Sequence, residues 1–289
     1  MKGKRRRKVM IVVGVFMVII GGILIYWNIP YSPGKASFTK QMQQRVEKLN
    51  KSEEVCTAEE IEKLPEPLQR YALYIGLENY PKYKMSNIKF ANTKFVFDAN
   101  SGKVLNMDYD LWLFNDQPYR SAFCSSSMYG VPFEGLDYCT EDKQGGMKGI
   151  LGKAIRIFDV KDDQGYKAVL ISWVAEGVTF NPAILVSPYL SYEVIDRNHV
   201  KATITYNGVS GTGIFTINDD GAITEFYSDE RQVEEIDGVK TPVGWRCEYR
   251  DYIEKGNTRQ ISKVRCVKVF PVKEVVYFDS DDFIVEHEQ

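Results

Sequence analysis

The chain has 289 residues, 37 of them basic and 39 acidic, for a formal net charge of −2. Six of the basic residues precede Val9, so 31 basic residues face 39 acidic ones over residues 9–289, a balance of −8. Such an acidic body repels phosphate backbones and argues against nucleic acid as a partner. The roughly 260 residues after the first apolar segment suffice for one large domain, which is our prediction, or for two small ones.

The first apolar segment runs from Val9 to Trp27, VMIVVGVFMVIIGGILIYW, and carries no charge. At about 1.5 Å per residue, a helix of this length spans most of a bilayer core of roughly 30 Å, so residues 9–27 are predicted to be a single-pass transmembrane helix. Residues 1–8 are strongly basic, which predicts a cytoplasmic N-terminus and a body outside the cytoplasm, held at the cell membrane.

The alternative is a cleaved secretion signal. The apolar core of such a signal is typically about 7–15 residues long and is followed directly by a small-x-small site. Here the core is longer, and the nearest such site, Gly34-Lys35-Ala36, lies well beyond it. We therefore predict an uncleaved anchor, with the membrane itself as the partner of residues 9–27.

Two helical patterns follow the anchor. Residues 28–56 are predicted to be a linker with an amphipathic helix, whose apolar stripe packs on the domain or lies along the membrane surface. Thr57-Ala58-Glu59-Glu60 has the form of a capping box, in which the Thr oxygen and a Glu carboxylate bind free backbone amides at a helix start. The exterior domain is predicted to occupy residues 57–289.

From Tyr83 onward, strict alternation replaces the helical spacing. Residues 105–113 and 200–206 alternate apolar and polar side chains, which is typical of strands with one buried face. The middle of the chain lacks this alternation, and residues 145–158 and 165–180 are predicted to be helices. Asn181-Pro182 then starts another short turn. The fold class is therefore α+β, a mainly antiparallel sheet with central helices.

The last long hairpin predicts a register for two of the five cysteines. A two-residue turn at Gly256-Asn257 pairs opposite charges on one face and apolar residues on the other. The same count sets Cys247 directly across from Cys266, at a Cα spacing that permits a disulfide. A disulfide and two reduced, buried side chains both remain open there. Cys124 and Cys139 are a second pair that could meet, across a turn near Val131-Pro132.

Several blocks together resemble a known family. The blocks are LPEPLQRYALYIGL at 64–77, GGMKGILGK at 145–153, WVAEGVTFNPAILVSPYLSYEVID at 173–196, VKATITYNGVSGTGIFTINDDG at 200–221 and VVYFDSDDFIVE at 275–286. In this order they resemble the bacterial family filed as domain of unknown function 6544. The resemblance covers nearly all of the exterior domain, and it implies no activity and no catalytic residue.

The order of elements is also similar to that of the envelope lipoprotein-carrier class. In that class a strongly curved antiparallel sheet forms a half-barrel that helices cover. This resemblance implies a half-barrel-like sheet with the central helices packed on it, enclosing an apolar cavity between them.

Familiar catalytic and metal motifs do not occur in the sequence. His199 and His287 have no second His or Cys at metal-ligand spacing, so no metal is expected. Residues 208–213, GVSGTG, continue into a strand pattern, which indicates glycines at a bulge or bend of a curved sheet and not a dinucleotide loop. No cofactor is implied.

Glu176 is the single carboxylate in the apolar stretch WVAEGV. If it faces a cavity, it can transfer a proton or bind a polar head group. Otherwise it points to water or pairs with an arginine such as Arg197 or Arg231. Asp196 and Asp251 join the candidates only if the fold brings them close to Glu176.

The leading hypothesis is a membrane-anchored exterior domain that binds an amphiphilic or apolar, lipid-like molecule between the curved sheet and the central helices. Its predicted lining residues are Trp173, Glu176, Phe180, Ile184 and Leu185. The alternatives are a cell-envelope enzyme with Glu176 as acid or base, which we weigh below a non-catalytic role, and a structural module for an unknown protein partner. An open apolar pocket favours the first, a second carboxylate or histidine within about 6 Å of Glu176 in a cleft favours the enzyme, and a closed dry core favours the third.

Overall fold

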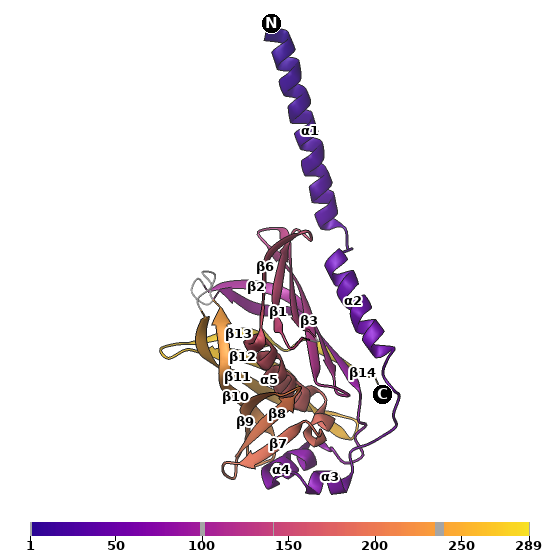
Figure 1. Ribbon diagram of the computed structural model, residues 1–289, viewed down its shortest axis with the longest axis vertical. Helices are drawn as coiled ribbons and strands as arrows, with labels where there is room; N and C mark the ends of the chain where they lie inside the picture. The colour runs from indigo at the N-terminus through magenta and orange to yellow at the C-terminus, as the bar shows by residue number, and fades with distance from the viewer. Residues whose placement is uncertain (1, 99–101, 141, 235–239, 289) are drawn as a thin grey trace.

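The computed structural model describes residues 2–98, 102–140, 142–234 and 240–288. A long helix, α1 (Lys2–Asn28), projects from a body in which a curled sheet wraps around one central helix, α5 (Asp163–Phe180). Figure 1 shows α1 above the body, with α2 (Pro33–Val46) beside the sheet and two short helices at the opposite end. The predicted α+β class with a half-barrel-like antiparallel sheet is confirmed.

Helix α1 belongs to the one helical span of the described chain that is long and apolar enough to cross a membrane. None of its apolar window is buried against the rest of the protein. By length and composition, the segment fits a membrane span and also a signal sequence, since both need an uncharged apolar helix near the N-terminus.

The described strands form a single sheet in which every neighbouring pair is antiparallel. Its order is β6-β5-β4-β3-β2-β1-β13-β12-β11-β10-β9-β8-β7. The first arm of the half-barrel contains β1 (Met85–Asp98), β2 (Lys103–Phe114), β3 (Tyr119–Met128), β4 (Val131–Cys139), β5 (Gly145–Leu151) and β6 (Ile155–Asp162). The second arm contains β7 (Leu190–Val194), β8 (His199–Tyr206), β9 (Val209–Ile217), β10 (Ile223–Glu234), β11 (Lys240–Lys255), β12 (Thr258–Val269) and β13 (Glu274–Ser280).

Strand β1 joins the two arms. One of its edges pairs with β2, while its other edge pairs first with β14 (Phe283–Glu288) and then with β13. A bulge after Phe90 separates these two halves of β1. Bulges increase local twist and bend the strand, which suits the junction of a strongly curved sheet.

The prediction of a helix over residues 145–158 is wrong, because this segment forms β5 and the first part of β6. The glycines of β5 allow neighbouring groups to pack closely against its backbone. A Cβ atom on Gly145 would lie 2.5 Å from the backbone of Gly165, and one on Gly149 would lie 2.3 Å from the Phe158 ring. Glycine in a strand permits such close approach, and here it removes the apolar alternation that would have indicated a strand.

The other predicted helix, residues 165–180, is confirmed as α5. Twelve of its 18 residues are buried, around its whole circumference. A helix that is apolar on all sides is stable only when it is enclosed. It fills the concave side of the sheet, and the Asp162 side chain caps its N-terminus by accepting from Gly165 N at 2.6 Å.

The remaining helices lie at one end of the body, on the convex face of the sheet or directly after α5. The Thr57 capping box is present at the start of α3 (Ala58–Glu62), and α4 (Glu66–Ile75) ends at Gly76 with a φ of 72°. A 3-10 helix, η1 (Pro182–Val186), follows Asn181 as expected. Of the two uses foreseen for the amphipathic helix, α2 has the first: its Phe38 and Met42 are buried on the convex face of the sheet, against Phe114, Tyr119 and Phe123.

The register predicted for the last hairpin is confirmed in full. Lys255 pairs with Thr258, Glu248 with Arg265 and Cys247 with Cys266. The pairing foreseen for Cys124 and Cys139 is wrong, since Cys124 lies opposite Gly135 on β4. Cys139 is four residues farther along that strand, roughly 13 Å at the usual rise, which exceeds the reach of a disulfide.

Candidate functional site

Paired residues of neighbouring strands define which side chains face the interior. Tyr109 on β2 lies opposite Cys124, which lies opposite Gly135, then Gly149 and finally Phe158 on β6. Directly paired residues project to the same face of a sheet. Tyr109 binds Arg120, which in turn binds Glu176 on α5, so this whole row lies on the concave face.

A buried ionic network joins α5 to the first arm on this face. Arg120 on β3 donates through Nε to Glu176 Oε2 at 2.7 Å and through Nη2 to Glu176 Oε1 at 2.9 Å. Its Nη1 donates to Asp137 Oδ2 at 3.1 Å, and its Nη2 also donates to the Tyr109 hydroxyl at 2.7 Å. The Tyr109 hydroxyl donates to Asp137 Oδ2 at 2.8 Å, which closes the network.

The network keeps its arginine charged. Burial lowers the pKa of the Arg120 guanidinium, but the adjacent Glu176 carboxylate, together with Tyr109 and Asp137, outweighs burial, so that this pKa lies well above its ordinary value. Both oxygens of Glu176 accept from Arg120, so the carboxylate is held as the acceptor in a fixed ion pair. This arrangement suits a clamp between helix and sheet better than a general acid or base.

The partner of Glu176 differs from those anticipated. Arg231 instead donates to the Ser172 hydroxyl and lies over the Trp245 ring, and Arg197 pairs with Asp219. Asp196 binds His199, and Asp251 pairs with Lys263 on the neighbouring strand. The carboxylate that shares Arg120 with Glu176 is Asp137, which sequence reasoning missed because β3 and β4 give no sign of which residues α5 will meet.

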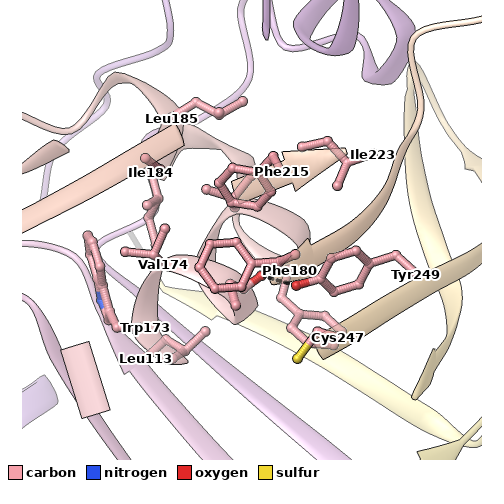
Figure 2. Close-up of a cluster of buried hydrophobic side chains, with 14 of the residues drawn as sticks. Leu113, Trp173, Val174, Phe180, Ile184, Leu185, Phe215, Ile223, Cys247 and Tyr249 are labelled. Carbon is pink, nitrogen blue, oxygen red and sulfur yellow. Dashed lines mark hydrogen bonds between the residues drawn. The ribbon is translucent and has the colours of Figure 1, made fainter. Parts of the chain in front are cut away.

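The apolar candidates lie in the core. Trp173, Phe180, Ile184 and Leu185 are at most 1% exposed. Figure 2 shows them packed among Val174, Phe215 and Ile223, with the Tyr249 hydroxyl donating to Ala175 O on α5. Trp173 also donates through Nε1 to Phe114 O at 2.8 Å. A ligand that touches these four side chains therefore requires α5 to move away from the sheet.

Cys247 and Cys266 lie in the same interior. Their Sγ atoms are 3.3 Å apart, and both thiols are free. Burial, together with the adjacent Cys266 thiol, raises the pKa of Cys247 well above its ordinary value. Cys247 is thus a protonated thiol at neutral pH, and the two free side chains fit the alternative of a reduced, buried pair.

An open part of the concave face lies beside the ionic network. Met147 on β5 pairs with Asp137 and is therefore an inward-facing residue, yet it is 43% exposed. Val160 pairs with Met147 from β6, and Phe158 lies one inward position farther along. Val160 and Phe158 are half-buried. These three side chains, Met147, Phe158 and Val160, form what we call the concave strip.

A hollow lies on the convex face. It has a volume of about 490 Å³ and is lined by the last turn of α2 and by residues of β1, β2 and β14. Glu47, Glu286 and Glu288 are among its lining residues, so its acidic wall does not match an apolar or anionic ligand. No local sequence pattern indicates this hollow, because α2 and β14 are far apart in the chain.

Neither histidine is placed for metal binding. No group of three potential metal-binding side chains occurs within the described ranges. His287 Nδ1 lies 2.8 Å from the Ser86 hydroxyl, and its ring stacks on Tyr83 at 4.4 Å. Burial lowers the pKa of His287 to about 4. In the 208–213 segment, Gly211 and Gly213 permit close packing, since a Cβ on them would lie 2.7 Å from the Ile171 side chain and 2.0 Å from the Phe226 ring. Gly208 has open space around it and adopts a φ of 76° in a turn.

Comparisons with known proteins give a family and two distant structural likenesses. No curated protein matches the chain. A LolA superfamily protein from Nitrosomonas europaea is 10% identical, with a TM-score of 0.33, over 79% of this chain and 93% of that one. A putative outer membrane lipoprotein-sorting protein domain from Vibrio parahaemolyticus is 5% identical, with a TM-score of 0.30, over 70% and 84%. The model of a family of unknown function, DUF6544, matches residues 54–280, and the chain belongs to this family.

Proposed function

We propose that this protein is a single-pass membrane protein whose exterior half-barrel binds an amphiphilic molecule on its concave face. In this proposal α1 spans the cell membrane, with the basic N-terminus in the cytoplasm. The body from residue 57 onward then lies outside the cytoplasm and receives its ligand close to the bilayer.

The observation that carries the proposal is the exposure of Met147 beside Asp137. An inward-facing apolar side chain that is 43% exposed leaves apolar surface open on the concave face. Directly next to it, Asp137 and Arg120 offer charged groups. An apolar surface bordered by a few convergent polar groups is the usual chemistry of a site for an amphiphile, because the chain and the head group are recognised separately.

Helix α5 controls how far such a ligand can enter. At its N-terminal end, Asp162 pairs with Lys240 at the start of β11, and Lys167 pairs with Glu230 on β10 at 2.7 Å. Farther along, Glu176 ties it to the first arm. The helix is thus fastened to both arms of the sheet. We propose that the ligand rests first on the concave strip and that the predicted lining residues, Trp173, Glu176, Phe180, Ile184 and Leu185, meet it only when α5 shifts.

Native mass spectrometry of the full chain, extracted gently from its own membrane, tests the ligand. We expect a co-purifying lipid-sized mass that is lost in Met147→Asp. Leu73→Asp is the matched control, because Leu73 on α4 is also an exposed apolar residue, 85% exposed, at the end of the body away from α1. A wild-type chain without bound mass, or equal occupancy in both variants, would contradict ligand binding and leave a structural module.

The anchor has its own test. Alkaline extraction of membranes should leave the full-length chain in the pellet, and protease added to intact cells should digest the body. A mature protein found in solution without residues 1–36 would show instead that the apolar segment is a cleaved signal.

A further inference from the structure

We propose that the tips of two hairpins form a second membrane contact, lying in the lipid head groups beside the end of α1. The tips are the β3–β4 turn, Tyr129-Gly130, and the β5–β6 turn, residues 152–154, with Ile155 and Ile157 on the following strand. This inference rests on the membrane anchor proposed above. It adds a lipid surface as the partner of a region that lies beyond the three side chains of the concave strip.

The β5–β6 tip contacts the end of α1. The Lys153 Nζ donates to Ile29 O at 2.6 Å, to Tyr31 O at 3.2 Å and to Tyr26 O at 3.4 Å. A Cβ on Gly152 would lie 2.9 Å from the Trp27 indole nitrogen. The β5–β6 tip is therefore level with the aromatic end of the apolar span, which is where a transmembrane helix meets the head groups. Figure 1 shows this hairpin reaching upward to the end of α1.

Exposed apolar and basic side chains occur together at the two tips. Ile155 is 64% exposed, Ile157 is 45% exposed and Tyr129 is 89% exposed. The β5–β6 hairpin, residues 145–162, carries four basic residues and two acidic ones, although residues 9–289 as a whole are acidic. The Lys103 ammonium lies 3.9 Å from the centre of the Tyr129 ring. Exposed apolar and aromatic groups with nearby cations match an interface with anionic lipid.

The backbone of the β3–β4 turn is strained at its tyrosine. Tyr129 has a φ of 53°. This left-handed conformation is unfavourable for a bulky side chain, and Asn or Gly adopts it at lower cost in such turns. Because Tyr129 is almost fully exposed, burial in the protein core does not explain the choice of tyrosine. A strained residue retained on the surface points to a function of its side chain, and tyrosine is a residue that membrane interfaces favour.

The test places a photoreactive amino acid at position 129 or 155 of the full-length chain, reconstituted in vesicles of phosphatidylcholine and phosphatidylglycerol. Position 73 on α4, exposed but distant from α1, is the matched control. We expect the yield of lipid adducts at positions 129 and 155 to exceed that at position 73 several-fold. Ile157→Asp should lower the adduct at position 155, and Leu73→Asp should not.

Separate outcomes distinguish this inference from the anchor. A chain that washes off the vesicles at alkaline pH contradicts the anchor itself. A chain that stays bound but gives equal lipid adducts at all three positions overturns the second contact alone. Adducts between two copies of the chain, in place of lipid adducts, would overturn it in favour of a protein interface. Asn at position 129 keeps the turn favourable. A lower yield of lipid adducts at position 155 in the Tyr129→Asn variant, without a fall in its melting temperature, would therefore support the inference.

Discussion

Arg120 on β3 and Glu176 on α5 form a two-bonded ion pair across the interior of the half-barrel, with N–O distances of 2.7 and 2.9 Å. Their side chains are only 8% and 16% exposed. A buried pair of this kind gains little over an apolar replacement of both partners, but the loss of one partner leaves an unpaired charge in the interior. The pair therefore specifies where α5 lies on the sheet.

Removal of one member of this pair should be costly. We expect Glu176→Leu to lower the free energy of unfolding by about 3–5 kcal/mol, because the Arg120 charge loses its main partner. Replacing both residues by leucine should recover much of that loss. Urea denaturation checks both variants, with Glu286→Gln as the control: the Lys89–Glu286 pair is exposed, and its loss should cost less than about 1 kcal/mol. Equal losses in the single variant and the control would contradict a buried clamp.

The cysteine pair predicts a response to oxidation. With oxidised glutathione as the disulfide reagent, one thiolate displaces a glutathione thiolate to form a mixed disulfide, and the second Cys then displaces the other glutathione. Because the raised pKa of Cys247 keeps it protonated, we expect slow reaction in the folded state and fast reaction in mild urea.

The bond should raise stability by about 3 kcal/mol, as for a closed loop of roughly 15–20 residues. The urea midpoint with and without reductant measures this, and mass spectrometry of unreduced peptides identifies the bond. The Cys247→Ala variant should show no oxidant effect. An equal shift in that variant would assign the effect to another cysteine.

His287 predicts a pH dependence. Its pKa in the folded state is about 4, lowered by burial, against about 6.5 in an unfolded chain. Between these values the unfolded chain binds a proton that the folded chain does not. The contribution of His287 to the free energy of unfolding is thus fully present above about pH 6.5. It falls as the pH drops towards 4, by at most about 1.4 kcal/mol per pH unit.

Urea denaturation at a series of pH values measures that slope. His287→Phe keeps an aromatic ring against Tyr83 and should flatten the curve in this window. His199→Gln is the control, because His199 lies at the surface beside Asp196. A slope that persists in His287→Phe would have to come from the carboxylates.

Gly145 offers a test of the strand that replaced the predicted helix. In an exposed helix, Gly→Ala stabilises by up to about 1 kcal/mol. In the structure a Cβ on Gly145 would lie 2.5 Å from the Gly165 backbone, so Gly145→Ala should destabilise the body. A lower melting temperature of Gly145→Ala would agree with the strand, and a higher one would agree with a helix. Gly22→Ala in α1 has open space around it and should leave the melting temperature of the body unchanged.

The strands that could be predicted from the sequence are those with a local signal, either a regular alternation of apolar and polar residues or a recognisable two-residue turn. The alternation of residues 105–113 and 200–206 was enough to place β2 and β8, and the Gly256-Asn257 turn was enough to fix the register of β11 and β12. In these segments one face of the strand is buried and the other faces solvent, so apolar and polar residues alternate along the sequence.

Sequence reasoning failed where packing depends on distant partners. The glycines of β5 are explained by Gly165 and Phe158, which are invisible to a local reading of residues 145–151. Likewise, Arg120 lies in a strand whose first five residues are all buried, so alternation does not single it out. Its pairing with Glu176, 56 residues away, depends on the angle at which α5 crosses the sheet.

The two partners on one edge of β1 have a consequence for the order of folding. Residues 85–90 pair with residues 283–288, so a strand made early waits for nearly the whole polypeptide before that edge is complete. Contacts of such long sequence separation slow folding, and an open edge is prone to pair with other chains. A nascent chain that pauses before Phe283 exposes this edge. Truncation of the final strand should therefore cause more aggregation than a substitution that removes any single contact.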